Sequence, residues 1–117
     1  MSDGLRLRVV FFATETGREP VREWIKSLPH EEQHVIGSDL LAVQYLWPIG
    51  MPLVRKLEED VWEVRSTLGN RIARVLFTVS GTRLVPLHGF IKQSQKTPLA
   101  DLNLARRRLR ELKRSMG

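Results

Sequence analysis

The second half of the chain contains four short runs rich in β-branched and aromatic residues, separated by turns of two or three residues. The runs lie at 54–57, 61–67, 71–79 and 83–91, and the turns between them are Glu58-Glu59-Asp60, Gly69-Asn70 and Ser80-Gly81. Connections this short join strands that run in opposite directions, because a parallel connection needs about a dozen residues. We therefore predict an antiparallel meander of three or four strands.

One strand and two helices are predicted before this meander. Apolar residues alternate with other residues over 5–12, a period of two that predicts a first strand. Pro20 suits the first position of a short amphipathic helix, which is expected to end near Pro29. A second helix is predicted at about 31–46.

A last helix is predicted after the meander. Thr97 is expected to cap it and Pro98 to begin it. Its apolar residues follow a spacing of three or four and are Leu102, Ala105, Leu109, Leu112 and Met116. The complete order of elements predicts an α+β fold with helices packed against an antiparallel sheet. Such a sheet needs helices on one face only, so we expect its other face to be open.

Length and composition narrow the class of protein. A chain of 117 residues with 42% apolar content is sized for one domain, which we expect to span residues 1–117. The absence of cysteine excludes a disulfide scaffold and thiolate metal sites. The longest apolar run, at 9–13, is too short to cross a bilayer, and no leader peptide is evident. We expect a soluble, cytoplasmic protein with no membrane partner.

The sequence lacks the residue patterns that several classes of enzyme require. No pair of carboxylates, no closely spaced histidines and no nucleotide-binding glycine loop is evident. These absences disfavour metal-dependent hydrolysis, glycosidase chemistry and nucleotide binding. We predict no metal and no cofactor.

Positive charge is concentrated at the end of the chain. Nineteen Lys and Arg against thirteen Asp and Glu give a net charge of +6, and residues 92–117 hold eight of these cations but only two anions. Localised positive charge is typical of a surface that binds a polyanion. Five cations of the last helix fall together beside its apolar stripe, namely Arg106, Arg107, Arg110, Lys113 and Arg114. The alternative is a solvated helix face, because a helix C-terminus favours cations through its dipole.

Further cations are expected on one face of the sheet. Along the strand 61–67, Arg65 shares a face with Glu63, while Trp62 and Val64 point to the other face. Arg74 lies in the middle of an apolar strand, where a charge is unfavourable unless it has a partner or a substrate. Arg65 alternatively makes an exposed ion pair across a strand, worth about 0–1 kcal/mol.

The last strand and the loop after it add polar and basic residues. His88 and Lys92 share one face of the strand, and Gln95 and Lys96 follow in the loop. An unperturbed histidine has a pKa near 6.5, which is why histidine suits proton transfer, and His88 is a candidate for that role; a structural hydrogen bond is the alternative. The loop residues are alternatively a solvated surface.

Arginine and lysine side chains that converge on one surface suit a phosphodiester. A guanidinium presents a rigid fork of donors to phosphate oxygens, and an ammonium presents a point charge. When the 2′-hydroxyl of RNA attacks its own phosphate, negative charge builds up on the nonbridging oxygens. Fixed cations stabilise that charge without a metal, and DNA, which has no 2′-hydroxyl, is spared.

The segments 61–66, 71–77 and 88–98, together with Leu104-Ala105-Arg106, resemble the HigB-type branch of the RelE toxin superfamily, which includes phage-derived host-killing proteins. The resemblance covers nearly the whole chain and is most specific at 90–98. It implies a RelE-like fold and the toxin of a type II toxin–antitoxin system. Such a toxin is a ribosome-dependent endoribonuclease, or mRNA interferase, that inhibits translation during stress. Its partner would be a cognate antitoxin, often a helix-turn-helix protein.

The resemblance also assigns roles to residues. Arg65 and Arg74 match the family's sheet-face arginines, and Lys92 and Lys96 match the basic residues of its last strand and of the loop that follows. Arg74 and Lys92 are assigned to the scissile phosphate and Arg65 to phosphate positioning. Lys96 is assigned to substrate binding or to protonation of the leaving group. Other residues predicted to contact RNA are Arg71, His88, Gln95, Arg106, Arg107 and Arg110.

The chain departs from the founding RelE pattern in two ways. Glu63 stands where that pattern has a lysine, and no tyrosine lies near the last helix. Arginine stays protonated at neutral pH, so the general base is either His88 or a lysine whose pKa is lowered by cationic neighbours.

Two other functions fit the same charges. One is a noncatalytic nucleic-acid-binding module whose basic last helix follows phosphates. The other is an antitoxin or structural partner whose basic helix contacts a protein.

Overall fold

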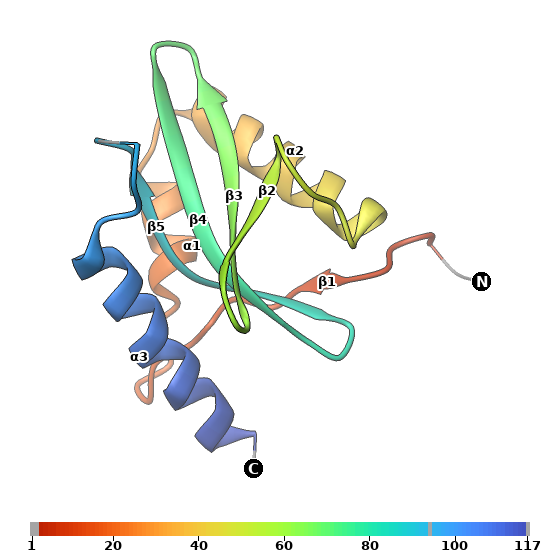
Figure 1. The fold of residues 1–117 in the computed structure, drawn as a ribbon, viewed down its shortest axis with the longest axis vertical. Coiled ribbons are helices and arrows are strands. Elements are labelled where there is room, and N and C mark those ends of the chain that lie inside the picture. The colour runs from red at the N-terminus through yellow and green to blue at the C-terminus, as the bar shows by residue number, and fades with distance from the viewer. Residues whose placement is uncertain (1–2, 94, 117) are drawn as a thin grey trace.

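The structure is a computed structural model and describes residues 3–93 and 95–116. Its elements, shown in Figure 1, are β1 (Arg8–Val9), α1 (Pro20–Lys26), α2 (His30–Leu46), β2 (Val54–Glu58), β3 (Val61–Leu68), β4 (Arg71–Ser80), β5 (Arg83–Ile91) and α3 (Leu99–Ser115). The strands form one sheet in the order β1-β5-β4-β3-β2. Strands β2 to β5 pair in antiparallel fashion, and β1 is parallel to β5. The predicted α+β fold and its meander are confirmed.

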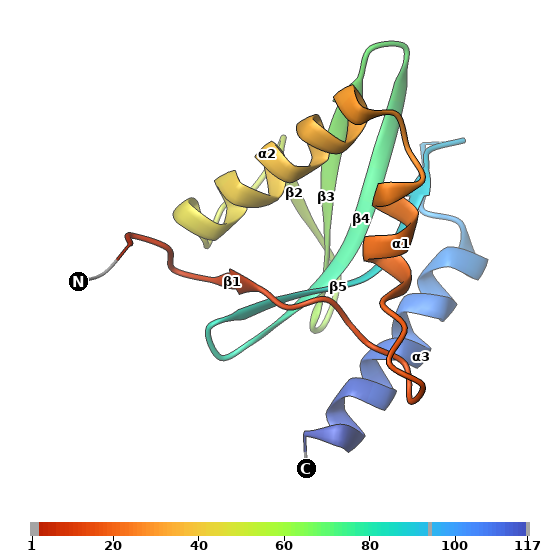
Figure 2. The same ribbon diagram turned by 180° about the vertical axis from the view of Figure 1, so that it is seen from behind.

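The helices lie on both faces of the sheet. Helices α1 and α2 cover one face, and α3 lies on the opposite face, as Figures 1 and 2 show from the two sides. The first core joins α1 and α2 to the sheet through residues such as Val21, Ile36, Val43, Val75 and Phe77. The second core joins α3 to the sheet through residues that include Val61, Leu76, Leu87, Ala105 and Leu109. The second sheet face is therefore partly covered, and our expectation of an open face was wrong where α3 packs.

Proline and glycine set the limits of several elements. Pro20 occupies the first turn of α1, as predicted. Helix α2 begins at His30 and ends before Trp47, whose ψ of 135° is extended because the next residue is a proline. Strand β5 contains Pro86, which has no N–H to donate, and the β4–β5 register shifts at this point to form a bulge. Strand β5 also contains Gly89, where a Cβ would lie 2.4 Å from the indole ring of Trp24 in α1.

Two sequence predictions about local structure need correction. The first strand was expected over 5–12, but β1 has only two residues, and beyond it the chain continues beside β5 through the N–H groups of Val10 and Phe12. Thr97 was expected to cap the last helix and Pro98 to begin it. Pro98 is instead the N-cap of α3, and no side chain caps this helix. The Thr97 hydroxyl donates a hydrogen bond to Glu63 instead.

None of the helices in the described part of the chain is both long and apolar enough to span a membrane.

Candidate functional site

Arg65 and Arg74 lie directly opposite each other on β3 and β4. Opposite residues of an antiparallel pair share a sheet face, with Cβ atoms about 5 Å apart. Lys92 follows β5, and its backbone N–H donates to the carbonyl of Ile72 at 2.7 Å, which places Lys92 beside β4. The structure thus brings together three of the four cations that were predicted to be catalytic. Lys96, the fourth, lies in the loop before α3.

A buried carboxylate neutralises part of this charge. Arg74 Nη1 donates to Glu63 Oε2 at 3.2 Å, and the two side chains are 2% and 0% exposed. Arg55 lies opposite Glu63 in the β2–β3 register, with 3.7 Å between its Nη2 and Glu63 Oε1. Glu63 is therefore the partner that a cation in the middle of an apolar strand requires. Neither Glu63 nor Arg55 was predicted as a site residue.

The loop after β5 closes this cluster. Thr97 Oγ1 donates to Glu63 Oε2 at 3.0 Å, and Arg74 Nη2 donates to the backbone carbonyl of Gln95 at 3.1 Å. We call Glu63, Arg55, Arg74 and Thr97 the Glu63 network. Arg74 is only 2% exposed and both of its terminal nitrogens donate within the protein, so in this conformation its guanidinium is not accessible to a phosphate.

Lys92 lies at the edge of the network, where its charge is unfavourable. Partial burial lowers the pKa of the Lys92 ammonium, and the positive charges of Arg65 and Arg74 lower it further. Its Nζ donates to Gln95 Oε1 at 3.3 Å. A lysine whose pKa is lowered by cationic neighbours is one of the two candidates for a general base.

Two surface hollows make Arg65 and Lys92 accessible to a ligand. Arg65 lines one of about 490 Å³ next to α2 and the start of β2. Lys92 lines another of about 340 Å³, together with Arg71, Gln93 and Gln95. The Arg65 side chain makes no hydrogen bond or ion pair with any residue that the structure describes, so its donors remain available to a ligand.

His88 forms its hydrogen bond with a residue outside the Glu63 network. Its Nε2 lies 2.6 Å from Asp101 Oδ1 in α3, and its ring stacks on Phe90 with 5.5 Å between the ring centres. Within the described residues it has no hydrogen bond to the cationic cluster. Arg71, another predicted RNA contact, forms an ion pair with Glu32 of α2.

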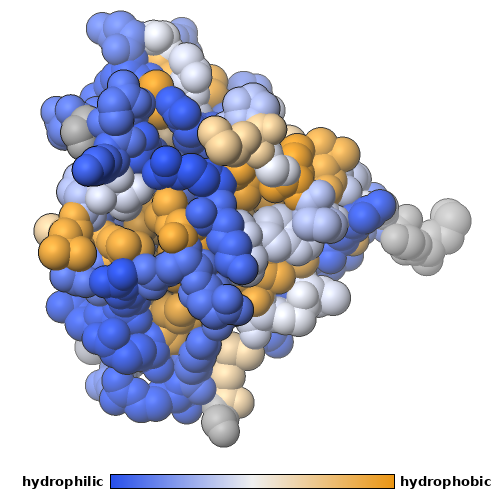
Figure 3. Space-filling model, viewed as in Figure 1, coloured by the Kyte–Doolittle hydropathy of each residue, from blue (hydrophilic) through white to orange (hydrophobic). Residues whose placement is uncertain are grey.

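The cations of α3 fall into two groups. Arg106 pairs with Glu58, Lys113 pairs with Asp60, and Arg108 donates to the carbonyl of Leu87 at 2.8 Å. The side chains of Arg107, Arg110 and Arg114 are exposed and make no hydrogen bond or ion pair with the described residues. Figure 3 shows that hydrophilic atoms cover most of the surface over α3, with smaller apolar areas among them.

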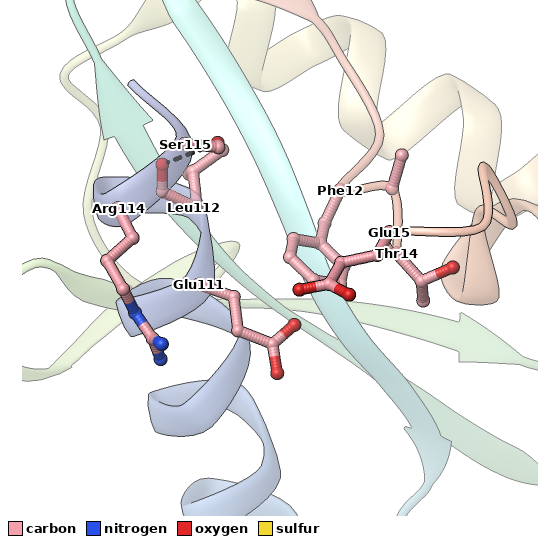
Figure 4. Close-up of a pocket in the computed structure, with 8 residues that line it drawn as sticks. Phe12, Thr14, Glu15, Glu111, Leu112, Arg114 and Ser115 are labelled. Carbon is pink, nitrogen blue, oxygen red and sulfur yellow. Dashed lines mark hydrogen bonds between the residues drawn. The ribbon is translucent and has the colours of Figure 1, made fainter. Parts of the chain in front are cut away.

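A further hollow lies between the chain after β1 and the last turns of α3. It measures about 340 Å³, with Phe12 and Leu112 among its lining residues. The side chains of Glu15 and Glu111 point into it, as Figure 4 shows. Two carboxylates outnumber the one cation that lines this hollow, Arg114, so it is not a candidate phosphate site.

The described residues contain no group of three or more His, Cys, Asp or Glu side chains that could hold a metal ion. We therefore identify no metal-binding residues in this part of the chain.

Comparison with protein families identifies a match. The model of the family described as "Phage derived protein Gp49-like (DUF891)" matches residues 23–110, which is more than half of the chain. The matched range begins in α1 and ends in α3, so it includes the Glu63 network, Arg65, Lys92 and Lys96. A search of curated proteins found no match.

Proposed function

Because the chain belongs to the Gp49-like family of phage-derived proteins, which is associated with toxin–antitoxin systems, we propose that it is a toxin that cleaves mRNA on the ribosome. We place it in the HigB-type branch of the RelE superfamily and in a type II system. The main support is the placement of Arg65 directly opposite Arg74, with Lys92 beside them. Among the described residues, four cations lie around the carboxylate of Glu63, namely Arg55, Arg65, Arg74 and Lys92. Asp39 also lines the hollow beside Arg65, so cations still outnumber carboxylates here, and this excess charge favours an anionic substrate.

The proposed reaction is attack by the ribose 2′-oxygen on the adjacent phosphorus atom. The bond from phosphorus to the 5′-oxygen breaks, which leaves a 2′,3′-cyclic phosphate and a 5′-hydroxyl. Arg65, which is partly exposed, contacts the nonbridging oxygens and stabilises the charge that develops on them, and Lys92 adds its positive charge there once it has accepted a proton. Arg74 adds its positive charge from its buried position in the sheet. It contacts the phosphate directly only when the Gln95 carbonyl is displaced.

Proton transfer requires a base and an acid. We propose that neutral Lys92 accepts the proton of the 2′-hydroxyl, because its lowered pKa increases the neutral fraction at a given pH. Lys96 then protonates the departing 5′-oxygen. His88 is the alternative base, and its bond to Asp101 would hold its ring in place.

The proposal also includes a cytoplasmic location and a cognate antitoxin, of the helix-turn-helix type. Coexpression with the neighbouring gene product is expected to restore growth, and a neighbour that leaves growth arrested is not the antitoxin.

The test is cleavage of a defined message by purified protein, with and without ribosomes. We expect cleavage only with ribosomes, products that end in a 2′,3′-cyclic phosphate, and no cleavage where the scissile nucleotide is 2′-deoxy. Arg65→Ala is expected to abolish cleavage. Arg83→Ala, which removes an exposed arginine outside the cluster, is the matched control and should cleave normally. Intact message at full occupancy of the ribosome would reject the proposal.

A noncatalytic nucleic-acid-binding module is the second candidate, and the exposed side chains of Arg107, Arg110 and Arg114 favour it. This function predicts binding without cleavage and a steep loss of affinity as salt rises. Replacing one phosphate-contacting arginine lowers the slope of log K against log salt by about 1. Arg107→Gln is therefore expected to reduce the slope, whereas Arg22→Gln, far from α3 in sequence and paired with Glu19, should not.

A further inference from the structure

We infer that Glu63 and Thr97 are positioning residues that hold the loop bearing Lys96 against the sheet and so fix Lys96 relative to Arg65 and Lys92. This inference rests on the proposed function and deepens it. Neither residue needs to touch RNA, because each acts through the side chains and the backbone that it binds.

Both chain neighbours of Lys96 are anchored. The backbone carbonyl of Gln95 accepts from Arg74 at 3.1 Å, and the hydroxyl of Thr97 donates to Glu63 at 3.0 Å. The Gln95 side chain also accepts from Lys92. One loop thus connects Lys96 to a buried ion pair, whereas Lys92 is also held beside β4 by its own backbone N–H.

The hydroxyl of Thr97 uses all of its hydrogen-bonding capacity. A hydroxyl offers one donor and two acceptor sites. Its donor goes to Glu63, while Arg55 Nη2 and Arg74 Nη1 both approach its oxygen at 3.4 Å. Because this hydroxyl does not cap α3, its bonding has no role in starting the helix. Its function is therefore to join the loop to the network.

The Glu63 network also contains buried polar atoms that lower the stability of the fold. Arg55 Nε, Arg74 Nε and Glu63 Oε1 are buried and have no hydrogen-bond partner among the described residues. Buried polar atoms without partners are unfavourable. The neighbouring atoms of the same side chains, Arg74 Nη2 and Glu63 Oε2, are the ones that bind the loop.

The test compares Thr97→Val, which keeps the shape but removes the hydroxyl, with Thr97→Ser, which keeps the hydroxyl. Misplacing a catalytic group by about 1 Å costs up to about 100-fold in rate. We expect Thr97→Val to lower kcat in the ribosome assay by about 10- to 100-fold and to leave KM nearly unchanged, because only the placement of Lys96 is lost. Thr97→Ser should restore most of kcat, and Thr82→Val, in an exposed turn, is the control.

Amide hydrogen exchange gives a readout that does not depend on activity. The amides of residues 95–97 should exchange faster in Thr97→Val than in the wild type, and at the wild-type rate in Thr97→Ser. Unchanged exchange in Thr97→Val, or a kcat equal to that of the wild type, would overturn the inference. If the wild-type protein cleaves nothing, the proposed function fails and Lys96 has no catalytic position to hold. The exchange rates still decide whether the loop is anchored.

Discussion

Removing the charge of Glu63 tests the central ion pair of the structure. Glu63→Gln keeps the size of the side chain but leaves Arg74 buried without a counter-ion. Because Glu63 is 0% exposed and Arg74 is 2% exposed, water cannot take over the role of the carboxylate without a rearrangement. Breaking a buried ion pair by removing one partner costs about 3–5 kcal/mol.

This cost is large relative to the stability of a chain of this size. Domains unfold with free energies of about 5–15 kcal/mol, so the variant is expected to lose a large fraction of its stability. With a shift of about 4 °C per kcal/mol, the melting temperature should fall by about 12–20 °C.

Urea unfolding, followed by circular dichroism, measures the effect. Adding Arg74→Met to Glu63→Gln removes the unpaired cation, so the double variant should be more stable than the sum of the single changes predicts, by about 1–3 kcal/mol. Glu23→Gln is the control, because the Arg18–Glu23 pair is largely exposed, at 72% and 45%. A loss below about 1 kcal/mol in Glu63→Gln would refute the argument that Glu63 is the buried counter-ion of Arg74.

Three further predictions follow from the same structure. Cleavage by the wild type should increase with pH as the Lys92 ammonium deprotonates, which a pH profile of the rate would show. Arg65→Gln, which removes a repelling charge, should raise the Lys92 pKa, as NMR titration of the lysine side chain would show without any need for activity. Gly89→Ala should destabilise the fold by about 1–3 kcal/mol through overpacking, whereas Gly37→Ala, in the open middle of α2, should stabilise it by up to about 1 kcal/mol, as thermal unfolding would show. Arg106 lowers the pKa of Glu58, so this pair stabilises the fold at pH values above the pKa of an unpaired glutamate and loses that effect as the pH falls. The difference in unfolding free energy between the wild type and Glu58→Gln should therefore shrink between pH 7 and pH ~3.

The meander could be predicted because its turns carry strong local signals. Gly69-Asn70 lies between β3 and β4 as expected, and β5 has the predicted bounds. The second turn is shifted by one residue, because Ser80 ends β4 and pairs with Arg83, which leaves Gly81 and Thr82 as the turn. The N-terminal strand was overestimated because alternation alone does not specify which residues pair with a neighbouring strand. Helix α3 was expected to start at Pro98, since local sequence does not show that Thr97 has a competing partner.

The ion-pair partner of Arg74 could have been predicted from the sequence. A two-residue turn at Gly69-Asn70 pairs Leu68 with Arg71, and the same register places Arg65 opposite Arg74. Glu63 then lies diagonally across from Arg74 on the same face. Combining the turn with the alternation of the strand would therefore have predicted the ion pair. The contact with Thr97 would still have been missed, because it depends on how the loop folds back.

The basic end of the chain could not be divided into paired and unpaired cations from sequence. Arg106 and Lys113 are neutralised by Glu58 and Asp60, which are about 50 residues away along the chain. Glu58 and Asp60 were predicted only as turn residues. Which cations remain available to a polyanion therefore depends on how α3 packs against the β2–β3 hairpin.

The most direct test of the account is a map of the 5′ ends of messages in cells that briefly express the protein. We expect the wild type and Arg83→Ala to produce new 5′ ends within translated regions, and Arg65→Ala to produce none while remaining folded and abundant. New ends at the same positions and frequency in Arg65→Ala would contradict a mechanism that depends on this cationic cluster.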